Sequence, residues 1–138
     1  MSDAIPFIPP ITGGIVIKVY DGDTITIVSK LPYDASPLYK FSVRINGIDC
    51  PEIKGKDADE KQCAKIAKQH VSDLILNKRV ELQNVGTEKY GRVLADVFID
   101  GRNVGEILVN ERLALVYNGG TKIRPNNWLR YHESGSME

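Results

Sequence analysis

One long helical segment, residues 57–77, interrupts a series of short strand-like segments, and this order restricts the possible folds more than any other feature of the chain. Acidic residues occupy the first turns of the segment and basic residues follow its end, an arrangement that complements the helix dipole. Apolar residues recur in it every three or four positions, at Cys63, Ala67, Val71 or His70, and Leu74. This spacing predicts one amphipathic helix with a single apolar stripe.

Short segments of alternating, β-branched sequence lie on both sides of this helix. Residues 24–28, for example, are Thr-Ile-Thr-Ile-Val, which is typical of a strand. Pro32 and Pro37 predict a loop over residues 29–40. A second, shorter helix is expected over residues 103–112. The expected strands are residues 15–19, 24–28, 41–48, 79–85 and 93–99.

Three strands, a helix, two strands and a helix predict an α+β, mainly β fold, and a five-stranded OB-fold barrel with two to three helices fits this order best. A split α+β sandwich is the structural alternative. A length of 138 residues suits one domain. We expect a flexible, proline-rich N-terminal arm at 1–12, a single domain at 13–132, an irregular course after Asn118, and a flexible tail at 133–138.

The sequence also restricts the cellular context. No apolar run approaches the roughly 18 residues that a membrane-spanning helix needs, and the N-terminus has three prolines in its first ten residues and no basic start of a secretory signal. We expect no membrane association and, if the chain is full length, a cytoplasmic protein; the alternative is that a signal was removed. Cys50 and Cys63 are too few for a four-cysteine zinc site, and we expect two free thiols rather than one disulfide.

Four carboxylates lie at two turns, and they are the strongest chemical signal in the chain. Asp21 and Asp23 precede the second expected strand, and Asp49 and Glu52 follow the third. Oxygen ligands of this kind suit Ca²⁺ or Mg²⁺, and a carboxylate that is not bound to the ion can take a proton from water. Arginine side chains such as Arg44 match the geometry of a phosphodiester. Each turn taken alone is better explained by local hydrogen bonds than as a set of metal ligands, and it is their occurrence together that favours a site.

The net charge of zero does not exclude nucleic acid as a partner. The 18 basic residues balance 18 acidic ones, whereas nucleic-acid-binding domains usually carry a basic excess. Without the four carboxylates at the turns, the remaining chain has an excess of four positive charges. Residues 112–132 contain four basic residues, three large aromatic residues and no acid, which suits either a surface for single strands or an ordinary solvated tail.

Three motifs in a fixed order carry a resemblance to a known family: Val19-Tyr20-Asp21-Gly22-Asp23-Thr24, Arg44-Ile45-Asn46-Gly47-Ile48-Asp49-Cys50-Pro51-Glu52, and Lys89-Tyr90-Gly91-Arg92. Together they resemble the staphylococcal nuclease (thermonuclease) family over residues 14–118. The resemblance implies an OB barrel with helices. It also implies a nuclease of low sequence specificity that hydrolyses single-stranded DNA and RNA and leaves 3′-phosphate ends.

The resemblance assigns a role to each motif residue. Asp23 and Asp49 match two ligands of a catalytic Ca²⁺, the backbone carbonyl of Cys50 matches a third, and Asp21 matches an acid that contacts the ion through water. Glu52 matches the general base for the attacking water. The residues that match substrate-binding positions are Arg44 and Arg92 for the scissile phosphate, Lys89 and Tyr90 for a terminal phosphate, and Tyr117 for base stacking.

The chain also departs from the family pattern. The loop at 29–40 is longer, the lysine-rich loop after Glu52 is reduced to Lys54-Gly55-Lys56, and the long third helix is missing or curtailed. We expect a monomeric Ca²⁺-dependent nuclease. The alternative is a non-catalytic OB-fold module that binds single-stranded nucleic acid or a protein partner. A purely structural β-domain leaves Arg44 and the acidic cluster unexplained.

Overall fold

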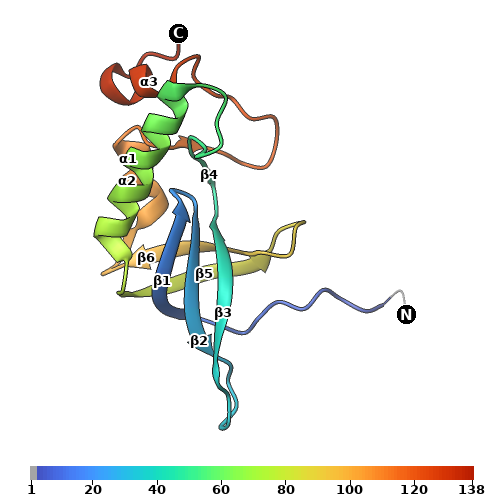
Figure 1. Ribbon diagram of the computed structural model, residues 1–138. Coiled ribbons are helices and arrows are strands. Elements are labelled where there is room, and N and C mark those ends of the chain that lie inside the picture. The colour runs from blue at the N-terminus through green and yellow to red at the C-terminus, as the bar shows by residue number, and fades with distance from the viewer. Residues whose placement is uncertain (1–2) are drawn as a thin grey trace.

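A closed β-barrel forms the body of the molecule. In the computed structural model, which describes residues 3–138, the sheet order is β3-β2-β1-β5-β6, and β3 also pairs in parallel with β6 (Figure 1). This last pairing closes the sheet, so the fold is the predicted OB-type barrel and not a sandwich. The five barrel strands are β1 (Gly13–Asp21), β2 (Thr24–Lys30), β3 (Leu38–Ile45), β5 (Arg79–Thr87) and β6 (Val93–Ile99).

The long helix α1 (Ala58–Ile75) confirms the predicted amphipathic segment. Its N-cap is Asp57, whose side chain accepts a hydrogen bond of 2.7 Å from the backbone N–H of Glu60. The helix packs against β1 through a fully buried stripe formed by Cys63, Ala67, Val71 and Ile75. Ile75 thus takes the place predicted for Leu74, which is only partly buried.

Strand β3 begins and ends earlier than predicted. Residues 28–30 of β2 pair with residues 38–40 of β3, so the expected loop at 29–40 is wrong and the connection is confined to residues 31–37. Pro32 and Pro37 flank the ladder without removing a hydrogen bond from it. Strand β3 stops at Ile45 because Gly47, at φ +81°, turns the chain into a separate short strand, β4 (Ile48–Asp49).

The C-terminal segment is more ordered than its sequence predicts. Beyond β7 (Arg102–Asn103), α2 (Val104–Asn110) and β8 (Leu115–Val116), the chain forms a third helix, α3 (Trp128–Ser134), so the expected irregular course after Asn118 is wrong there. The helix forms because Asn127 caps its first turn and Trp128, only 3% exposed, anchors it in the core. β8 pairs with β4, which places the following loop beside Asp49.

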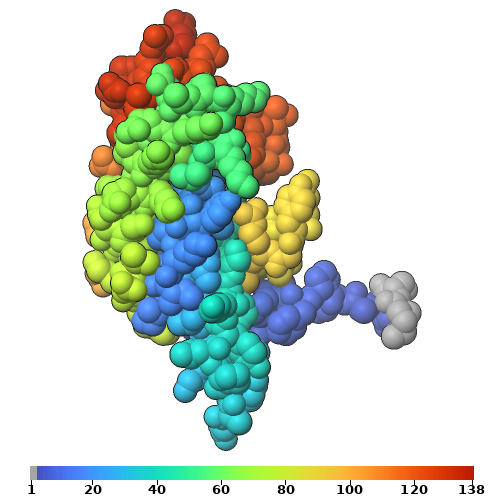
Figure 2. Space-filling view, in the orientation of Figure 1, coloured from blue at the N-terminus to red at the C-terminus, as the bar shows by residue number. Residues whose placement is uncertain are grey.

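The N-terminal segment lies apart from the barrel (Figure 2), and the two cysteines lie inside the molecule. Figure 2 shows the N-terminal segment running away from the barrel, with Ile5 and Phe7 exposed; residues 1 and 2 of the expected arm lie outside the described residues. Cys50 and Cys63 are both buried free thiols, as predicted. Within residues 3–138, no helix has the length and hydrophobicity required to cross a membrane.

Candidate active site

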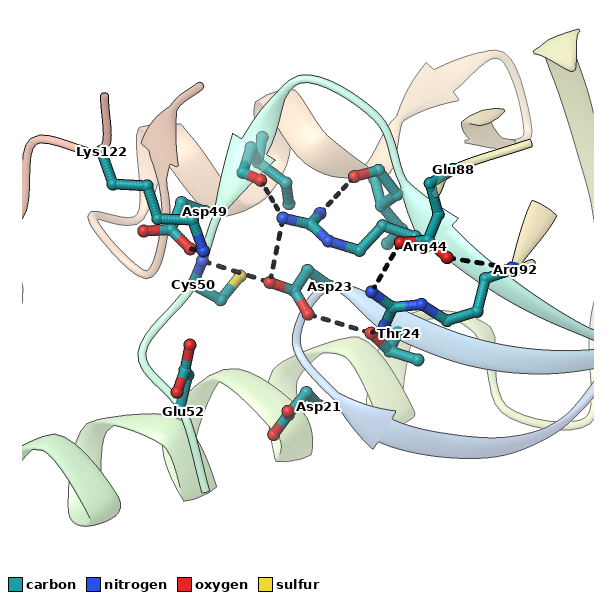
Figure 3. Close-up of polar contacts among 12 residues, drawn as sticks. Asp21, Asp23, Thr24, Arg44, Asp49, Cys50, Glu52, Glu88, Arg92 and Lys122 are labelled. Carbon is teal, nitrogen blue, oxygen red and sulfur yellow. Dashed lines mark hydrogen bonds and ion pairs between the residues drawn. The ribbon is translucent and has the colours of Figure 1, made fainter. Parts of the chain in front are cut away.

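A polar pocket of about 220 Å³ collects the predicted site residues at one end of the barrel. It lies where the β1–β2 turn, the end of β3 and the segment after β4 come together (Figure 3). The charged residues that line it are Asp21, Asp23, Asp49, Glu52, Arg44, Arg92, Lys54 and Lys122. The structure therefore brings together all four carboxylates and both arginines that the sequence singled out.

Gly22 allows the β1–β2 turn to approach the helix closely. A Cβ atom at this position would lie 3.0 Å from the Cβ of Ala67 and 3.1 Å from the Sγ of Cys50. A larger residue would push the turn away from α1 and from the chain after β4. The glycine thus keeps Asp21 and Asp23 close to the residues that follow β4.

Asp23 occupies the middle of the pocket. Its Oδ1 accepts a hydrogen bond of 3.1 Å from the Thr24 hydroxyl, and its Oδ2 accepts one of 3.4 Å from the backbone N–H of Cys50. The Arg44 guanidinium lies 3.6 Å from the same Oδ2. Arg44 is itself fixed, because it donates to the backbone carbonyls of Ile45 at 2.6 Å and Ile48 at 2.7 Å.

Asp49 is almost fully buried and faces two cations. Lys122 Nζ lies 3.3 Å from its Oδ1, and Arg124 Nε lies 3.5 Å from its Oδ2. The Oδ2 atom accepts no hydrogen bond although it is buried, so its charge is compensated only by the ion pair. A buried carboxylate oxygen without a hydrogen bond is costly, which makes this atom a strong acceptor for any cation that reaches it.

A network that the sequence did not predict holds these groups. Glu60, only 6% exposed, accepts a hydrogen bond of 2.7 Å from Arg124 and one of 3.0 Å from the backbone N–H of Glu52. Arg124 also donates to the Cys50 carbonyl at 3.4 Å. From the sequence, Glu60 is only an acid in the first turn of a helix and Arg124 only one charge in a basic stretch. Their partners are distant in sequence, so no local signal identifies them.

The Arg92 side chain extends into the pocket, and its guanidinium lies between Thr24 and Glu88 (Figure 3). Its guanidinium lies 3.2 Å from Glu88 and donates to the Thr24 hydroxyl at 3.3 Å. Limited burial opposes ionisation of Glu88, but hydrogen bonds from the side chain and backbone of Arg92 outweigh it and lower the Glu88 pKa. The Arg92 side chain is about one third exposed, whereas that of Glu88 is only 14% exposed. If Arg92 turned away, Glu88 would keep the hydrogen bonds from the backbone N–H groups of Tyr90 and Arg92.

Asp21 carries a perturbed carboxyl group. Its partial burial and the nearby charge of Asp23 raise its pKa from 3.8 to about 6, against the lowering effect of a hydrogen bond from the backbone N–H of Ile53. Ionised Asp21 is therefore disfavoured in the folded chain. A cation in the pocket would compensate this charge, and a proton competes with such a cation below about pH 6.

Replacing Asp21 with asparagine should stabilise the protein in the absence of added metal. At pH 7.5 the carboxyl is ionised in both the folded and unfolded chains, so the full cost of its charge is present; near pH 3.5 it is mostly protonated in both, and the cost disappears. After allowance for solvent screening, we expect a gain of about 1 kcal/mol at pH 7.5 that shrinks toward pH 3.5. Urea unfolding at the two pH values measures it, and an equal gain at both would contradict the assignment.

The residues expected to bind the rest of a nucleotide are only partly brought to the site. Tyr117 lines a neighbouring groove of about 590 Å³ together with Arg44. Lys89 and Tyr90 lie on the protruding β5–β6 loop (Figure 2), with the Lys89 Nζ 5.1 Å from the Tyr90 ring centre. Tyr90 is 75% exposed, and neither residue lines the polar pocket. The structure thus joins Tyr117 to the site but leaves Lys89 and Tyr90 outside it.

The pocket offers oxygen ligands for a hard cation, though only a few. Among residues 3–138, no three histidine, cysteine, aspartate or glutamate side chains converge as a metal-binding group. Asp23 and Asp49 nevertheless line the pocket with two carboxylates, and Cys50, whose carbonyl is the third expected ligand, directly follows Asp49 in the chain. One or two carboxylates completed by water are a common way to hold Mg²⁺, and Ca²⁺ also accepts carbonyl and water ligands. The residues present therefore fit a hard cation.

Comparison with known proteins relates the chain to one family. Residues 42–133 match the family described as Staphylococcal nuclease homologue. An uncharacterized endonuclease of Haemophilus influenzae is 32% identical over 102 residues, which are 74% of this chain and 51% of that protein. Endonuclease YncB of Bacillus subtilis is 32% identical over 111 residues, which are 76% of this chain and 49% of that protein.

A third relative has the same degree of sequence identity to the chain. The SPbeta prophage-derived endonuclease YokF of Bacillus subtilis is 32% identical over 111 residues, 76% of this chain and 35% of that protein. The chain thus matches about one third to one half of the length of these curated relatives.

Proposed function

The chain belongs to the family of staphylococcal nuclease homologues, and from this premise we propose that it is a nuclease that hydrolyses phosphodiester bonds of nucleic acid. The observation that carries the proposal is the convergence of four carboxylates and two arginines in one polar pocket. Carboxylates supply metal ligands and a base, and arginines supply phosphate binding, which together are the groups that phosphodiester hydrolysis needs. The matched relatives named as endonucleases support the same assignment.

Asp23, Asp49 and the Cys50 carbonyl are the proposed ligands of a catalytic Ca²⁺, with Asp21 contacting it through water. When bound, the ion supplies positive charge that polarises the phosphate. The orphaned Oδ2 of Asp49 supports this role, because it is a buried acceptor without a hydrogen bond. The raised pKa of Asp21 supports it as well, since burial and the neighbouring charge of Asp23 disfavour the ionised carboxyl and a bound cation would compensate its charge.

Glu52 is the proposed general base. Its side chain lines the pocket, and its backbone N–H is held by buried Glu60, so its backbone position does not depend on its own carboxylate. The carboxylate accepts a proton from water, and the resulting hydroxide attacks phosphorus in line with the leaving oxygen. The carboxylate side chain itself can therefore be neutralised without loss of the local fold.

Arg44 and Arg92 are the proposed phosphate-binding residues. Arg44 is held rigidly by two backbone carbonyls and by Asp23, so it presents a preorganised positive charge to a phosphate in the pocket. Arg92 must exchange its contact with Glu88 for the phosphate. Both then stabilise the negative charge that grows on the phosphate oxygens during attack.

The finer features of the substrate follow from the aromatic residues. We assign Tyr117 to stacking on a base, and Lys89 and Tyr90 to contact with a terminal phosphate. An unpaired base is free to stack on an aromatic side chain, so single-stranded DNA and RNA are the proposed substrates. From the family relation we also propose low sequence specificity and 3′-phosphate ends. A monomer with one nuclease domain at 13–132 is sufficient for this activity.

One observation favours a second candidate function. Asp49, a proposed metal ligand, is paired with Lys122 and Arg124, so the carboxylate is already neutralised by the chain itself. A barrel in this state suits a non-catalytic OB-fold module that binds single-stranded nucleic acid or a protein partner. The two functions differ in one simple respect, because a binding module forms complexes with DNA but does not shorten it.

The metal dependence of DNA cleavage tests the proposed function. Incubation of the chain with heat-denatured DNA and CaCl₂ should produce short fragments with 3′-phosphate ends, and EDTA should reduce cleavage to the level of the buffer control. A parallel series with Mg²⁺ and Mn²⁺ measures the preference among hard cations. Retarded but intact DNA with every cation in the series would support the binding module and reject the nuclease.

A further inference from the structure

The loop between β8 and α3, residues 117–127, reaches across the pocket and places two cations on Asp49. Lys122 Nζ lies 3.3 Å from one carboxylate oxygen and Arg124 Nε lies 3.5 Å from the other. β8 pairs directly with β4, with Leu115 opposite Asp49, so the loop starts beside this carboxylate. Figure 3 shows the Lys122 side chain extending to Asp49 from the loop.

The two cations are held very differently. Arg124 is anchored by Glu60 at 2.7 Å, by the Cys50 carbonyl at 3.4 Å and by the Trp128 ring, whose centre lies 5.5 Å away. These contacts keep Arg124 in place whether or not Asp49 is available. Arg124 therefore belongs to the framework of the site.

Lys122 is held by fewer contacts than Arg124. Its side chain is 43% exposed, and Asp49 is its single ion-pair partner among residues 3–138. Its other neighbour is the Tyr117 ring, whose centre lies 5.5 Å from Nζ. An ammonium group on a flexible four-carbon stem can leave one partner for another at small cost when it stays in contact with water.

Lys122 and a bound cation exclude each other. An ion held by Asp49 and Asp23 would bring two positive charges against the ammonium group that contacts the same carboxylate. Repulsion between like charges at such short distances in a partly buried pocket is strong. Binding of the ion therefore requires the contact between Lys122 and Asp49 to open.

We propose that Lys122 is an internal counter-cation of Asp49, which a divalent ion displaces and which then binds the phosphate of the substrate. This inference rests on the proposed nuclease function. The displaced ammonium group remains in the pocket that Arg44 and Arg92 also line, where a phosphate would lie. Lysine binds phosphate as a point charge without the fixed geometry of arginine, so it can follow the phosphate through the reaction.

The test is a pair of measurements on Lys122→Met. Titration calorimetry with CaCl₂ should show a dissociation constant about tenfold lower than that of the unaltered chain, because the competing charge is gone. Steady-state cleavage of a single-stranded oligonucleotide should show a KM about tenfold higher, because one phosphate contact is lost. Lys65→Met, which removes the same charge from an exposed position of α1, should leave both constants nearly unchanged.

The opposite signs of these two effects distinguish the proposal from a structural role. Loss of a residue that merely supports the loop would weaken the binding of both the ion and the substrate. An unchanged Ca²⁺ affinity in Lys122→Met would overturn the proposal while leaving the nuclease function intact. A higher Ca²⁺ affinity with an unchanged KM would overturn the part of the proposal in which Lys122 binds the phosphate. If neither protein binds Ca²⁺ or cleaves DNA, the proposed function itself fails.

Discussion

Replacing Arg92 with alanine should lower kcat for cleavage of denatured DNA by about 10³-fold, the order of effect seen when an arginine that stabilises a phosphoryl transition state is removed. The folded structure should survive, because Arg92 is partly exposed and Glu88 keeps its hydrogen bonds from the backbone N–H groups of Tyr90 and residue 92. The loss should appear mainly in kcat, since the charge that Arg92 stabilises grows only during the attack on phosphorus.

Two further variants make the experiment with Arg92 specific. Arg92→Lys keeps the charge but not the fork of N–H groups, so it should recover only part of the lost activity. Arg102→Ala removes an exposed arginine of β7 that lies away from the pocket and should cleave at the normal rate. Cleavage by Arg92→Ala within about twofold of the unaltered chain would show that Arg92 remains with Glu88 during the reaction.

Replacing Glu52 with glutamine should lower kcat by about 10²- to 10⁴-fold, the usual contribution of a positioned general base. Glutamine has the same shape but cannot accept the proton of the attacking water. The local backbone should not change, because Glu60 holds the backbone N–H of residue 52 and not its side chain. KM should change little, since the substitution removes a proton acceptor and no phosphate contact.

Glu81→Gln is the matched control for Glu52→Gln. It makes the same change at an exposed position of β5, outside the pocket, and should leave the cleavage rate unaltered. Melting curves of both variants should coincide with that of the unaltered chain. If the Glu52→Gln protein folds and cleaves DNA at the normal rate, Glu52 is not the general base. Asp21, whose raised pKa lies near 6, would then be the next residue to substitute.

The barrel and its long helix were predictable because their signals are local. Strand β2 follows directly from the alternation in residues 24–28, and α1 follows from the spacing of Cys63, Ala67 and Val71. The same is true of the turn with Asp21 and Asp23, where glycine and aspartate favour a tight connection. For β2, α1 and this turn, the local sequence was sufficient to predict the element that forms.

The errors arose where long-range pairing overrides local preference. Residues 38–40 carry little strand signal, but they complete a ladder with residues 28–30 and so extend β3. The segment after Asn118 is rich in glycine and asparagine, yet α3 forms because Trp128 is buried among residues of the core. Both outcomes depend on partners that the local sequence does not reveal.

The four carboxylates and two arginines could be named as candidate site residues only from the three motifs taken together, since each turn alone is explained by local hydrogen bonds. Their partners could not be named. Glu60 meets Arg124 across 64 positions of sequence, and Lys122 reaches Asp49 from a loop whose course is set by the pairing of β8 with β4. Turns and strands depend on neighbouring residues, whereas compensation of a buried charge depends on whichever side chains the closed barrel brings to it.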